Sequence, residues 1–372
     1  MRPYQDNMME LDLEALAHNL DYIKQLAGLD KQIIASVKAN AYGHDAKQVA
    51  QVLQLKGVDA LATGSLEEAR EIRKHGIDTP VLLFSFATPQ KTILAAQEGF
   101  IPTIPNLQTA IEINSACSKP IPVYLKVDCG LGRLGVPIID AKTFVKSVAQ
   151  MVRLKIAAIY THVPFSNEAS SDWAEDKLNQ FDCLIDDLRE SGYPIAITQA
   201  MASCCLLTGL HDKTTSVCVG HALYGLSPFD SSSSVHSHSL RPVIRSVTST
   251  LIHIGRHPKG SDIAVSGLYG TAQPHRVGVL PVGMSLGLRG PVEGQRMCVL
   301  VNGRSCPVLA VSLEHTSIGL DTVEDVAIGD QATLIGRNGD ETLSLLDLAN
   351  SWHLTPLQAL MCISGRFSVR QT

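Results

Sequence analysis

The chain has 372 residues, of which 45% are hydrophobic and 18% are charged, so it is suited to one large barrel with an appendage or to two domains. Lys and Arg number 31 and Asp and Glu number 36, which gives a net charge of −5 without any basic block. We therefore expect neither nucleic acid nor a membrane as a partner. No apolar run approaches the roughly 18 residues of a spanning helix, and the N-terminus lacks a signal pattern, so a cytoplasmic protein is predicted.

The cysteines and histidines do not form metal or disulfide patterns. Nine cysteines are an odd number in a long chain, and none of them forms a CxxC pair. This spacing favours reduced thiols over a disulfide framework. The 13 histidines show no HExxH or other paired metal spacing, so no metal site is expected.

From about residue 8 to 225 the chain alternates short apolar runs with stretches of helical periodicity, and we predict a first domain over residues 8–235. The predicted strands are Ile33–Lys38, Ala60–Thr63, Val81–Phe84, Val123–Val127, Ile156–His162 and Ile195–Gln199. The predicted helices include Ser65–His75, Lys91–Glu98, Asn106–Ser115 and Trp173–Ser191, and Ser65 with Glu68 forms a capping-box pattern. Repeated βα units of this number predict an α/β fold with a (β/α)₈ barrel. An open doubly wound sheet is the alternative, but no GxGxxG follows the first strand.

The polar segment Asp230–Ser239 has no periodicity and is the best linker in the chain. Beyond it, residues 240–372 carry short β-type runs separated by turn signals. These runs are Ser246–Ile252, Arg276–Leu280, Met297–Val301, Val308–Val311 and Gln331–Ile335, with one helix around Ser344–Ser351. We predict a mostly β C-terminal domain, on which residues 1–7 pack.

Lys38 stands at the end of the first predicted barrel strand. Barrel active sites lie at the carboxyl ends of the strands, where a partly buried lysine with a lowered pKa can form a Schiff base. On composition alone, the competing interpretation is a lysine that extends to solvent at the barrel rim.

The segment VKANAYGH at 37–44 resembles the cofactor-lysine motif of the alanine racemase family. Further matching segments occur in the family's order: TGSLEEAREIR at 63–73, LKVDCGLGRLG at 125–135, THVPFSNE at 161–168, MASCCLL at 201–207, GHALYGLSP at 220–228, LPVG at 280–283 and VLVNGRSCPVLAVS at 299–312. The resemblance covers nearly the whole chain. It implies a pyridoxal 5′-phosphate (PLP) enzyme with an N-terminal (β/α)₈ barrel and a C-terminal β domain.

The resemblance implies specific roles on the cofactor side. Lys38 would hold PLP covalently and act as the base on one face of the substrate. Tyr42, Ser203 and the backbone amides of Gly220 and His221 would bind the phosphate, as bare N–H groups and short polar residues at a barrel rim can. Alone, Ser203 would equally be a helix cap.

The same resemblance assigns residues around the ring and the substrate. His162 would lie near the pyridine ring, and Arg133 would place the substrate carboxylate through its planar, always charged fork. Lys126 matches a lysine that is carbamylated in many family members, although an unmodified Lys126 is chemically possible. The backbone N–H of Leu313 would also contact the carboxylate.

Two positions on the cofactor and catalytic side depart from the family pattern. Cys218 replaces an arginine that donates to the pyridine nitrogen, and a thiol cannot supply that charge. The family's second base is a tyrosine. Counting without gaps from Pro281 puts Val265 at this position, whereas matching the letters YG makes Tyr269 the second base. An ordinary structural role for Tyr269 stays open.

The substrate side also loses hydroxyl groups, because Met284 and Leu357 stand where the family has tyrosines, and Leu313 stands where it has a methionine. We predict an alanine racemase that interconverts L- and D-alanine, or a related small amino acid, and so serves D-alanine and peptidoglycan-precursor biosynthesis. The resemblance implies a homodimer with shared active sites. The alternatives are a diverged relative with one-base chemistry on Lys38 and a non-enzymatic PLP-binding protein.

Overall fold

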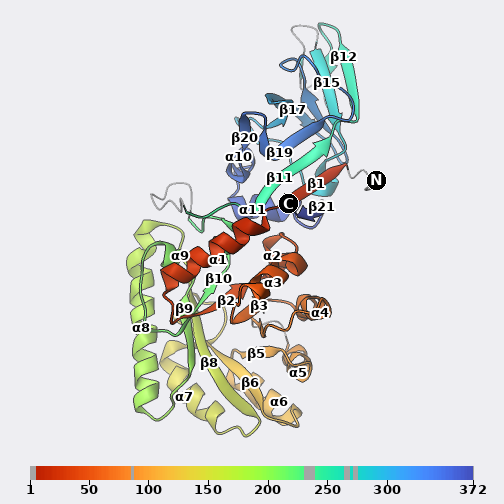
Figure 1. Ribbon diagram of the computed structural model, residues 1–372. Coiled ribbons are helices and arrows are strands. Elements are labelled where there is room, and N and C mark those ends of the chain that lie inside the picture. Colours follow the sequence, from red (N-terminus) through yellow and green to blue (C-terminus); the bar gives the residue numbers. More distant parts are fainter. Residues whose placement is uncertain (1–5, 85–87, 230–238, 264–268, 271–274, 372) are drawn as a thin grey trace. The chain divides into compact units, whose positions relative to one another are not determined.

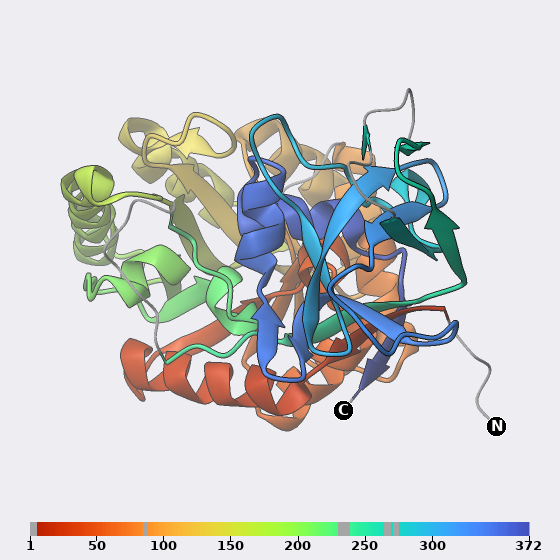
Figure 2. The same cartoon turned by 90° about the horizontal axis from the view of Figure 1, so that it is seen from above.

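The computed structural model describes residues 6–84, 88–229, 239–263, 269–270 and 275–371. The chain divides into two compact units. The barrel unit comprises 14–41 and 46–241, and the β unit comprises 1–13, 42–45 and 242–372. Figures 1 and 2 show the elements of each unit in two orientations.

Within the described residues, the barrel unit contains a closed parallel barrel of eight strands. These are β2 (Gln32–Ser36), β3 (Ala60–Thr63), β4 (Val81–Leu83), β5 (Ile101–Ile104), β6 (Ile121–Asp128), β8 (Leu154–Val163), β9 (Ile197–Met201) and β10 (Ser216–Val219). Closure requires β10 to pair with β2, which places Cys218 opposite Ile34, and β5 to pair with β6. The short β7 (Val136–Pro137) pairs in parallel with the end of β6. The (β/α)₈ prediction is confirmed, and the open-sheet alternative is wrong because its two edges would be unpaired.

Helices connect the strands of the barrel unit (Figure 1). They are α1 (Leu13–Ala27), α3 (Ala46–Leu55), α4 (Leu66–Lys74), α5 (Pro89–Gln97), α6 (Leu107–Ala116), α7 (Ile138–Ala149), α8 (Ser171–Glu190) and α9 (Ser203–Leu207), with the 3₁₀ turns η1 (Glu168–Ser170) and η2 (His221–Tyr224). The side chains of Ser65, Thr88 and Asn106 accept backbone N–H bonds at the starts of α4, α5 and α6. Such caps satisfy amides that have no partner inside the helix, which is why these helices begin where they do.

The chain after β2 forms the short turn α2 (Lys38–Tyr42), which is left-handed. The φ angles of Ala39, Asn40 and Ala41 lie between 53° and 55°. The strand therefore ends at Ser36, two residues before the predicted end at Lys38. Lys38 begins the turn instead of closing the strand.

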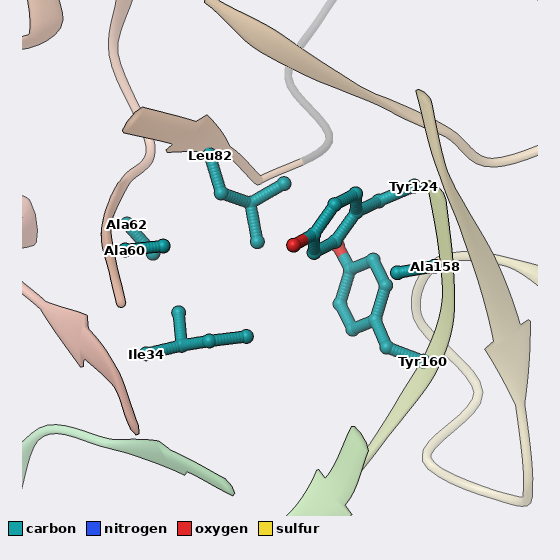
Figure 3. Packing of buried hydrophobic residues seen from close by; sticks show 7 residues of the cluster. All are labelled: Ile34, Ala60, Ala62, Leu82, Tyr124, Ala158 and Tyr160. Carbon is teal, nitrogen blue, oxygen red and sulfur yellow. The ribbon is translucent and has the colours of Figure 1, made fainter. Parts of the chain in front are cut away.

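The barrel interior is packed rather than hollow (Figure 3). Tyr124 from β6 and Tyr160 from β8 meet edge to face, with ring centroids 6.4 Å apart and planes at 62°. The Tyr160 hydroxyl is 2.9 Å from the hydroxyl of Thr103 on β5, so its polar tip has a partner inside the apolar cluster. Smaller side chains, among them Ala60, Ala62 and Ala158, complete the cluster. Large rings opposite small residues fill the interior without a pore.

Among the described residues, the β unit is built on a ten-stranded sheet in the order β12-β15-β18-β17-β16-β19-β11-β1-β21, with β20 paired to β19. The strands are β1 (Asn7–Leu11), β11 (Ile244–Thr250), β12 (His253–His257), β15 (His275–Leu280), β16 (Cys298–Val301), β17 (Arg304–Val311), β18 (Thr316–Gly319), β19 (Gln331–Asn338), β20 (Glu341–Leu343) and β21 (Ser368–Gln371). The unit also contains the hairpin β13 (Asp262–Ile263) and β14 (Tyr269–Gly270), η4 (Met284–Leu286), α10 (Leu345–Ser351) and α11 (Pro356–Ile363). The predicted mostly β C-terminal fold is confirmed.

The N-terminal strand belongs to this sheet. β1 pairs antiparallel with β11 and parallel with β21. The predicted linker lies outside the described residues except for Ser239, whose carbonyl oxygen is 2.9 Å from the Nε2 atom of His18. Among the helices described, none combines the length and the apolar character that a bilayer crossing requires.

Candidate active site

The predicted cofactor residues of the barrel unit gather at the carboxyl ends of its strands. Lys38 follows β2, Lys126 and His162 lie near the ends of β6 and β8, Ser203 follows β9, and Cys218 lies on β10. Because the eight strands are parallel and closed, these ends form one mouth. The fold therefore brings together residues that are up to 180 positions apart in the sequence.

Lys38 lies at this mouth and is exposed to solvent, although the surrounding protein partly desolvates its amine. Its Nζ atom is 5.9 Å from the centroid of the Phe84 ring. Burial lowers the pKa of Lys38, Cys218 opposes this effect, and the positive charge of Arg133 adds to the lowering. A lysine with a lowered pKa has more uncharged amine at neutral pH, which is the form that attacks a carbonyl group or accepts a proton.

Lys126 is the most deeply buried cation of the site, with 7% of its surface exposed. Its Nζ atom lies 4.3 Å from the centroid of the Tyr160 ring and has no hydrogen-bond partner among the described residues. Burial lowers the pKa of Lys126 to about 7, with Cys129 opposing the effect and Arg133 reinforcing it. Near neutral pH, a large share of this amine is therefore uncharged.

The two histidines of the mouth are neutral at pH 7. Burial, together with the positive charges of Lys126, Lys38 and Arg133, lowers the pKa of His162 to about 3. Burial and the charge of Lys38 lower the pKa of His221 to about 4. Positive charge in the site thus comes from Arg133 and from the protonated fractions of Lys38 and Lys126, beside two neutral imidazoles, an arrangement that favours an anionic ligand.

Arg133 belongs to the loop between β6 and β7 and is exposed. It lines a hollow of about 510 Å³ together with residues such as Pro89 and Asn106, at the first turns of α5 and α6. The guanidinium is thus accessible from solvent while its charge acts on the pKa values of Lys38, Lys126 and His162. This position suits the binding of a small carboxylate.

Ser203 links the ends of β9 and β10. The side chain is buried, and its Oγ atom accepts hydrogen bonds from the backbone N–H groups of Gly220 at 3.2 Å and Ala222 at 3.3 Å. The Tyr224 hydroxyl donates to the Ser36 carbonyl at 2.9 Å and ties this turn to the end of β2. The structure brings Ser203 and the Gly220 turn together, and it adds contacts of Ala222 and Tyr224 that sequence reasoning missed.

Cys218 faces the barrel interior next to the aromatic cluster. Burial raises the pKa of the Cys218 thiol to about 11, and the charges of Lys38 and Lys126 only partly offset this effect. The thiol is therefore protonated at neutral pH and is a weak hydrogen-bond donor. It brings no charge to the strand on which it lies.

Three predicted site residues belong to the β unit. Tyr42 is buried. Tyr269 opens β14, where its backbone pairs with Ile263, while the competing Val265 lies outside the described residues. Leu313 is 64% exposed, and its carbonyl accepts the N–H of Ser285 at 2.8 Å.

The apolar residues that depart from the family pattern differ in their exposure to solvent. Met284 lies in η4 and is 52% exposed, and its N–H donates to the Ser312 carbonyl at 3.0 Å. The loops that carry Met284 and Leu313 are therefore joined by backbone bonds and expose two large apolar side chains. Leu357 is half-buried in the first turn of α11.

Sequence reasoning missed Tyr160 and Glu68 as residues that shape the mouth. Tyr160 lies two positions before His162 on β8, so the period-two alternation of strands was a signal that both side chains face the same side. The Glu68 carboxylate accepts hydrogen bonds from the Thr63 hydroxyl and from the Asn40 N–H, in addition to the backbone cap that Ser65 provides. No spacing rule in the sequence points to the Asn40 contact.

Comparisons with known proteins agree with this geometry. The family models for the N-terminal and C-terminal domains of alanine racemase match residues 11–228 and 244–371. The chain is 30% identical over 361 residues to the alanine racemase of Halothermothrix orenii, covering 96% of this chain and 94% of that protein. It is 29% identical to the alanine racemase of Geobacillus stearothermophilus, over 93% of this chain and 88% of the relative.

Solved structures share the whole fold. An alanine racemase from Bacillus anthracis with bound L-Ala-P superposes with a TM-score of 0.89 at 28% identity, covering 100% of this chain and 96% of that one. A Clostridium difficile alanine racemase reaches a TM-score of 0.91 at 24% identity, over 100% and 97% of the two chains, and supports the fold alone. With both domain models matched and relatives aligned from end to end, this chain belongs to the alanine racemase family, whose members are PLP-dependent amino acid racemases.

Proposed function

We propose that this protein interconverts L- and D-alanine with PLP held at Lys38. The observation that carries the proposal is a partly desolvated lysine at the mouth of a barrel, among cations that no acidic side chain of the predicted site balances. A phosphate and an amino acid carboxylate would both be attracted there. A related small amino acid as the preferred substrate is an outcome of the test below.

The chain's own residues fit PLP. The lowered pKa of Lys38 supplies the uncharged amine that covalent attachment needs. Ser203 and the turn at Gly220 and His221 offer a hydroxyl and backbone N–H groups to a phosphate, with Tyr42 as a further phosphate ligand. When bound, PLP draws electrons from the substrate Cα and so acidifies its hydrogen.

Lys38 would move the proton on one face of the substrate, because its lowered pKa favours the uncharged amine that can accept a proton. Tyr269 would move the proton on the other face. Arg133 and the backbone N–H of Leu313 would hold the carboxylate, and the neutral His162 would lie against the ring. The role of Tyr269 depends on matching the letters YG, whereas the other roles follow the family motifs position by position.

Lys126 would carry a carbamate. Its amine is about half uncharged at pH 7 and its Nζ atom has no hydrogen-bond partner among the residues described. Attack of this amine on CO₂ forms an N–C bond and releases one proton, which turns a buried cation into an anion able to pair with Arg133. An unmodified Lys126 would instead repel Arg133.

A diverged enzyme with one-base chemistry on Lys38 is the second candidate function. Cys218 supports it, since a protonated thiol places no positive charge beside the ring nitrogen. If Cys218 faces that nitrogen, Cys218→Arg changes the absorption spectrum of the bound cofactor or the pH dependence of turnover. Identical spectra and pH profiles in the two proteins would show that Cys218 is elsewhere.

We further propose a cytoplasmic homodimer whose active sites are shared, and a role in supplying D-alanine for peptidoglycan precursors. The domain division 8–235 and 240–372 is part of this proposal. Its support is the separation of the chain into two compact units. The second base comes from the β unit, which is the unit that the partner would contribute.

The direct test is incubation of the PLP-loaded protein with each L-amino acid, followed by chiral chromatography. Formation of D-alanine faster than any other D-amino acid supports the proposal, whereas no D-product from any substrate contradicts it. Lys38→Ala should abolish both the product and the absorbance of covalently held PLP. Retained absorbance in that variant would place the attachment at another lysine.

A further inference from the structure

The backbone that follows Lys38 takes a conformation that its residues do not favour. Ala39, Asn40 and Ala41 have φ and ψ angles of about 50°, and none of them is glycine. Left-handed backbone brings Cβ close to the next carbonyl oxygen, so three such residues in succession are strained. A strained segment of this kind persists only where its surroundings hold it.

The turn itself provides only part of that support. The Ala41 N–H donates to the Val37 carbonyl at 2.9 Å, which closes the turn. The Val37 N–H donates to the Ala62 carbonyl at 2.8 Å, and this bond fixes the residue before the turn to β3. The side chain of Asn40 accepts the N–H of Ala46 at 2.9 Å and so fixes the start of α3. The N–H of Asn40 needs an acceptor from outside the turn, as the first amides of a helix do.

Glu68 provides that acceptor. Its Oε1 atom accepts the Asn40 N–H at 2.8 Å, and its Oε2 atom accepts the hydroxyl of Thr63, the last residue of β3. Thr63 is fully buried, so this end of the bridge is fixed to the barrel wall. Because the acceptor is an ionised carboxylate, its hydrogen bonds with these two neutral donors are charge-assisted. Figure 1 shows α2, β3 and α4, the elements that this carboxylate connects.

We propose that Glu68 is a positioning residue for Lys38, because its carboxylate clamps the left-handed turn that sets the direction of the Lys38 side chain at the barrel mouth. The proposal rests on the role of Lys38 given under Proposed function. Without the clamp, Asn40 relaxes toward right-handed backbone, and the Lys38 side chain no longer keeps its direction at the mouth. Glu68 touches neither cofactor nor substrate in this account.

The test compares Glu68→Gln with Glu67→Gln. Glu67 is the matched control, because it precedes Glu68 on α4, accepts a bond from the Ser65 hydroxyl at 2.8 Å and lies 3.5 Å from Lys91. Each variant removes one negative charge from the first turn of the same helix. A glutamine at 68 keeps the size of the side chain but cannot accept from both Thr63 and Asn40.

Two readouts separate positioning from folding. The first is the rate at which PLP becomes attached to Lys38, trapped with borohydride and located by peptide mass spectrometry across pH 6–10. The second is kcat and KM for the racemised amino acid. For Glu68→Gln we expect kcat to fall about tenfold or more, KM to change little, and the midpoint of the attachment profile to move to higher pH. Glu67→Gln should match the unsubstituted protein.

Restoring the activity of Glu68→Gln with a second substitution provides a third test. Glycine enters left-handed backbone without a Cβ clash, so Ala39→Gly in the Glu68→Gln background should restore part of the lost kcat. If Glu68→Gln does not fold, Thr63→Val removes the other anchor and should move the attachment midpoint in the same direction. Equal midpoints and equal kcat for Glu68→Gln and Glu67→Gln would overturn the proposal. Absence of label at Lys38 in the unsubstituted protein would instead overturn the proposed function.

Discussion

At the scale of single residues, the site works through what burial does to charged and neutral groups. The amines of Lys38 and Lys126 lose water and have lowered pKa values, while the thiol of Cys218 has a raised one. Each group is thereby driven toward its uncharged form. Deprotonated amines and neutral imidazoles are the forms that attack carbonyl carbons and accept protons, so burial itself prepares the mouth for proton-transfer chemistry.

Lys126 should destabilise the apoprotein in a pH-dependent way. Its pKa is about 7 in the folded chain, against an ordinary value of 10.5. Between these two pH values the unfolded chain binds a proton at this amine that the folded chain does not, so the free energy of unfolding rises with pH. Below about pH 7 the amine is charged in both states, and the destabilisation by its burial is at its maximum. Lys126→Met should therefore raise the free energy of unfolding at pH 6 by about 1–3 kcal/mol, and by less at pH 10.

Urea unfolding of the apoprotein in CO₂-free buffer measures this effect. Lys155→Met, at an exposed position on β8, is the control and should change stability equally at both pH values. A Lys126→Met protein with the same gain at pH 6 and pH 10 would show that the folded chain tolerates the charged amine.

Tyr269 should govern inversion but not exchange. A phenol with an ordinary pKa of about 10 is a poor base unless a cation or hydrogen bond lowers that value. With Cys218 in place of a charged donor, inversion should be slower than α-hydrogen exchange. In D₂O, one enantiomer of alanine should exchange with retention through Lys38 faster than it inverts, and Tyr269→Phe should suppress inversion and leave that exchange.

Proton NMR combined with chiral chromatography distinguishes exchange from inversion in one sample. Rapid and equal exchange and inversion from both enantiomers would show that the second face is fully equipped. Unchanged inversion in Tyr269→Phe would move the second base to another residue.

At the scale of elements, periodicity and caps predict well where the local signal is strong. The predicted strand Ala60–Thr63 coincides with β3, and the predicted helix Ser65–His75 includes α4 with its two cap residues. Two short barrel strands are missing from the prediction. β5 contains Pro102, which weakens a strand pattern, and β10 has only four residues. In α11, the cap Thr355 and Pro356 were a helix-start signal that sequence reasoning passed over.

The left-handed turn after Lys38 could not be predicted from its residues. Ala39 and Ala41 prefer right-handed backbone, and only distant contacts such as that of Glu68 reverse this preference. The proposed cofactor residues, in contrast, could be named from the sequence because each carries a distinctive side chain inside a recognisable motif. Residues that act through the backbone, such as Ala222, leave no such mark in the sequence.

Gly287, in the β unit, should not tolerate a larger residue, because it also has a positive φ angle and lies against another backbone segment. Its φ angle is 83°, and a Cβ atom there would lie 1.8 Å from the carbonyl oxygen of Cys362 in α11. Gly287→Ala should lower the free energy of unfolding by at least about 2 kcal/mol. Gly290→Ala is the control, since a Cβ there meets no atom within 4 Å. It should change stability by less than about 0.5 kcal/mol.

Urea titration monitored by circular dichroism tests both variants. A Gly287→Ala protein as stable as Gly290→Ala would mean that η4 and α11 can separate at little cost. A large loss in both variants would point to a general intolerance of this loop rather than to the contact with Cys362.

At the scale of the whole molecule, the division of labour between the two units indicates why a dimer is proposed. The cofactor residues Lys38, His162 and Ser203 lie in the barrel unit, whereas Tyr269 and Leu313 lie in the β unit. The barrel mouth described here supplies one base, Lys38, and the proposed second base comes with the other unit. If the partner's β unit completes each site, a mutation in the barrel unit removes one chain's contribution to the site, and a mutation in the β unit removes the other chain's contribution.

Mixing two inactive variants tests this arrangement. Lys38→Ala removes the first base and Tyr269→Phe the second, so each homodimer has two defective sites. After subunit exchange, half of the dimers should contain one chain of each kind, and each of these carries one intact site and one doubly defective site. Racemase activity should therefore recover to about a quarter of the unsubstituted level, provided that the sites are shared and exchange is random. Differential tags and native mass spectrometry establish that mixed dimers have formed. If they form and activity stays at the level of the separate variants, both bases of a site come from one chain, and the shared site is wrong.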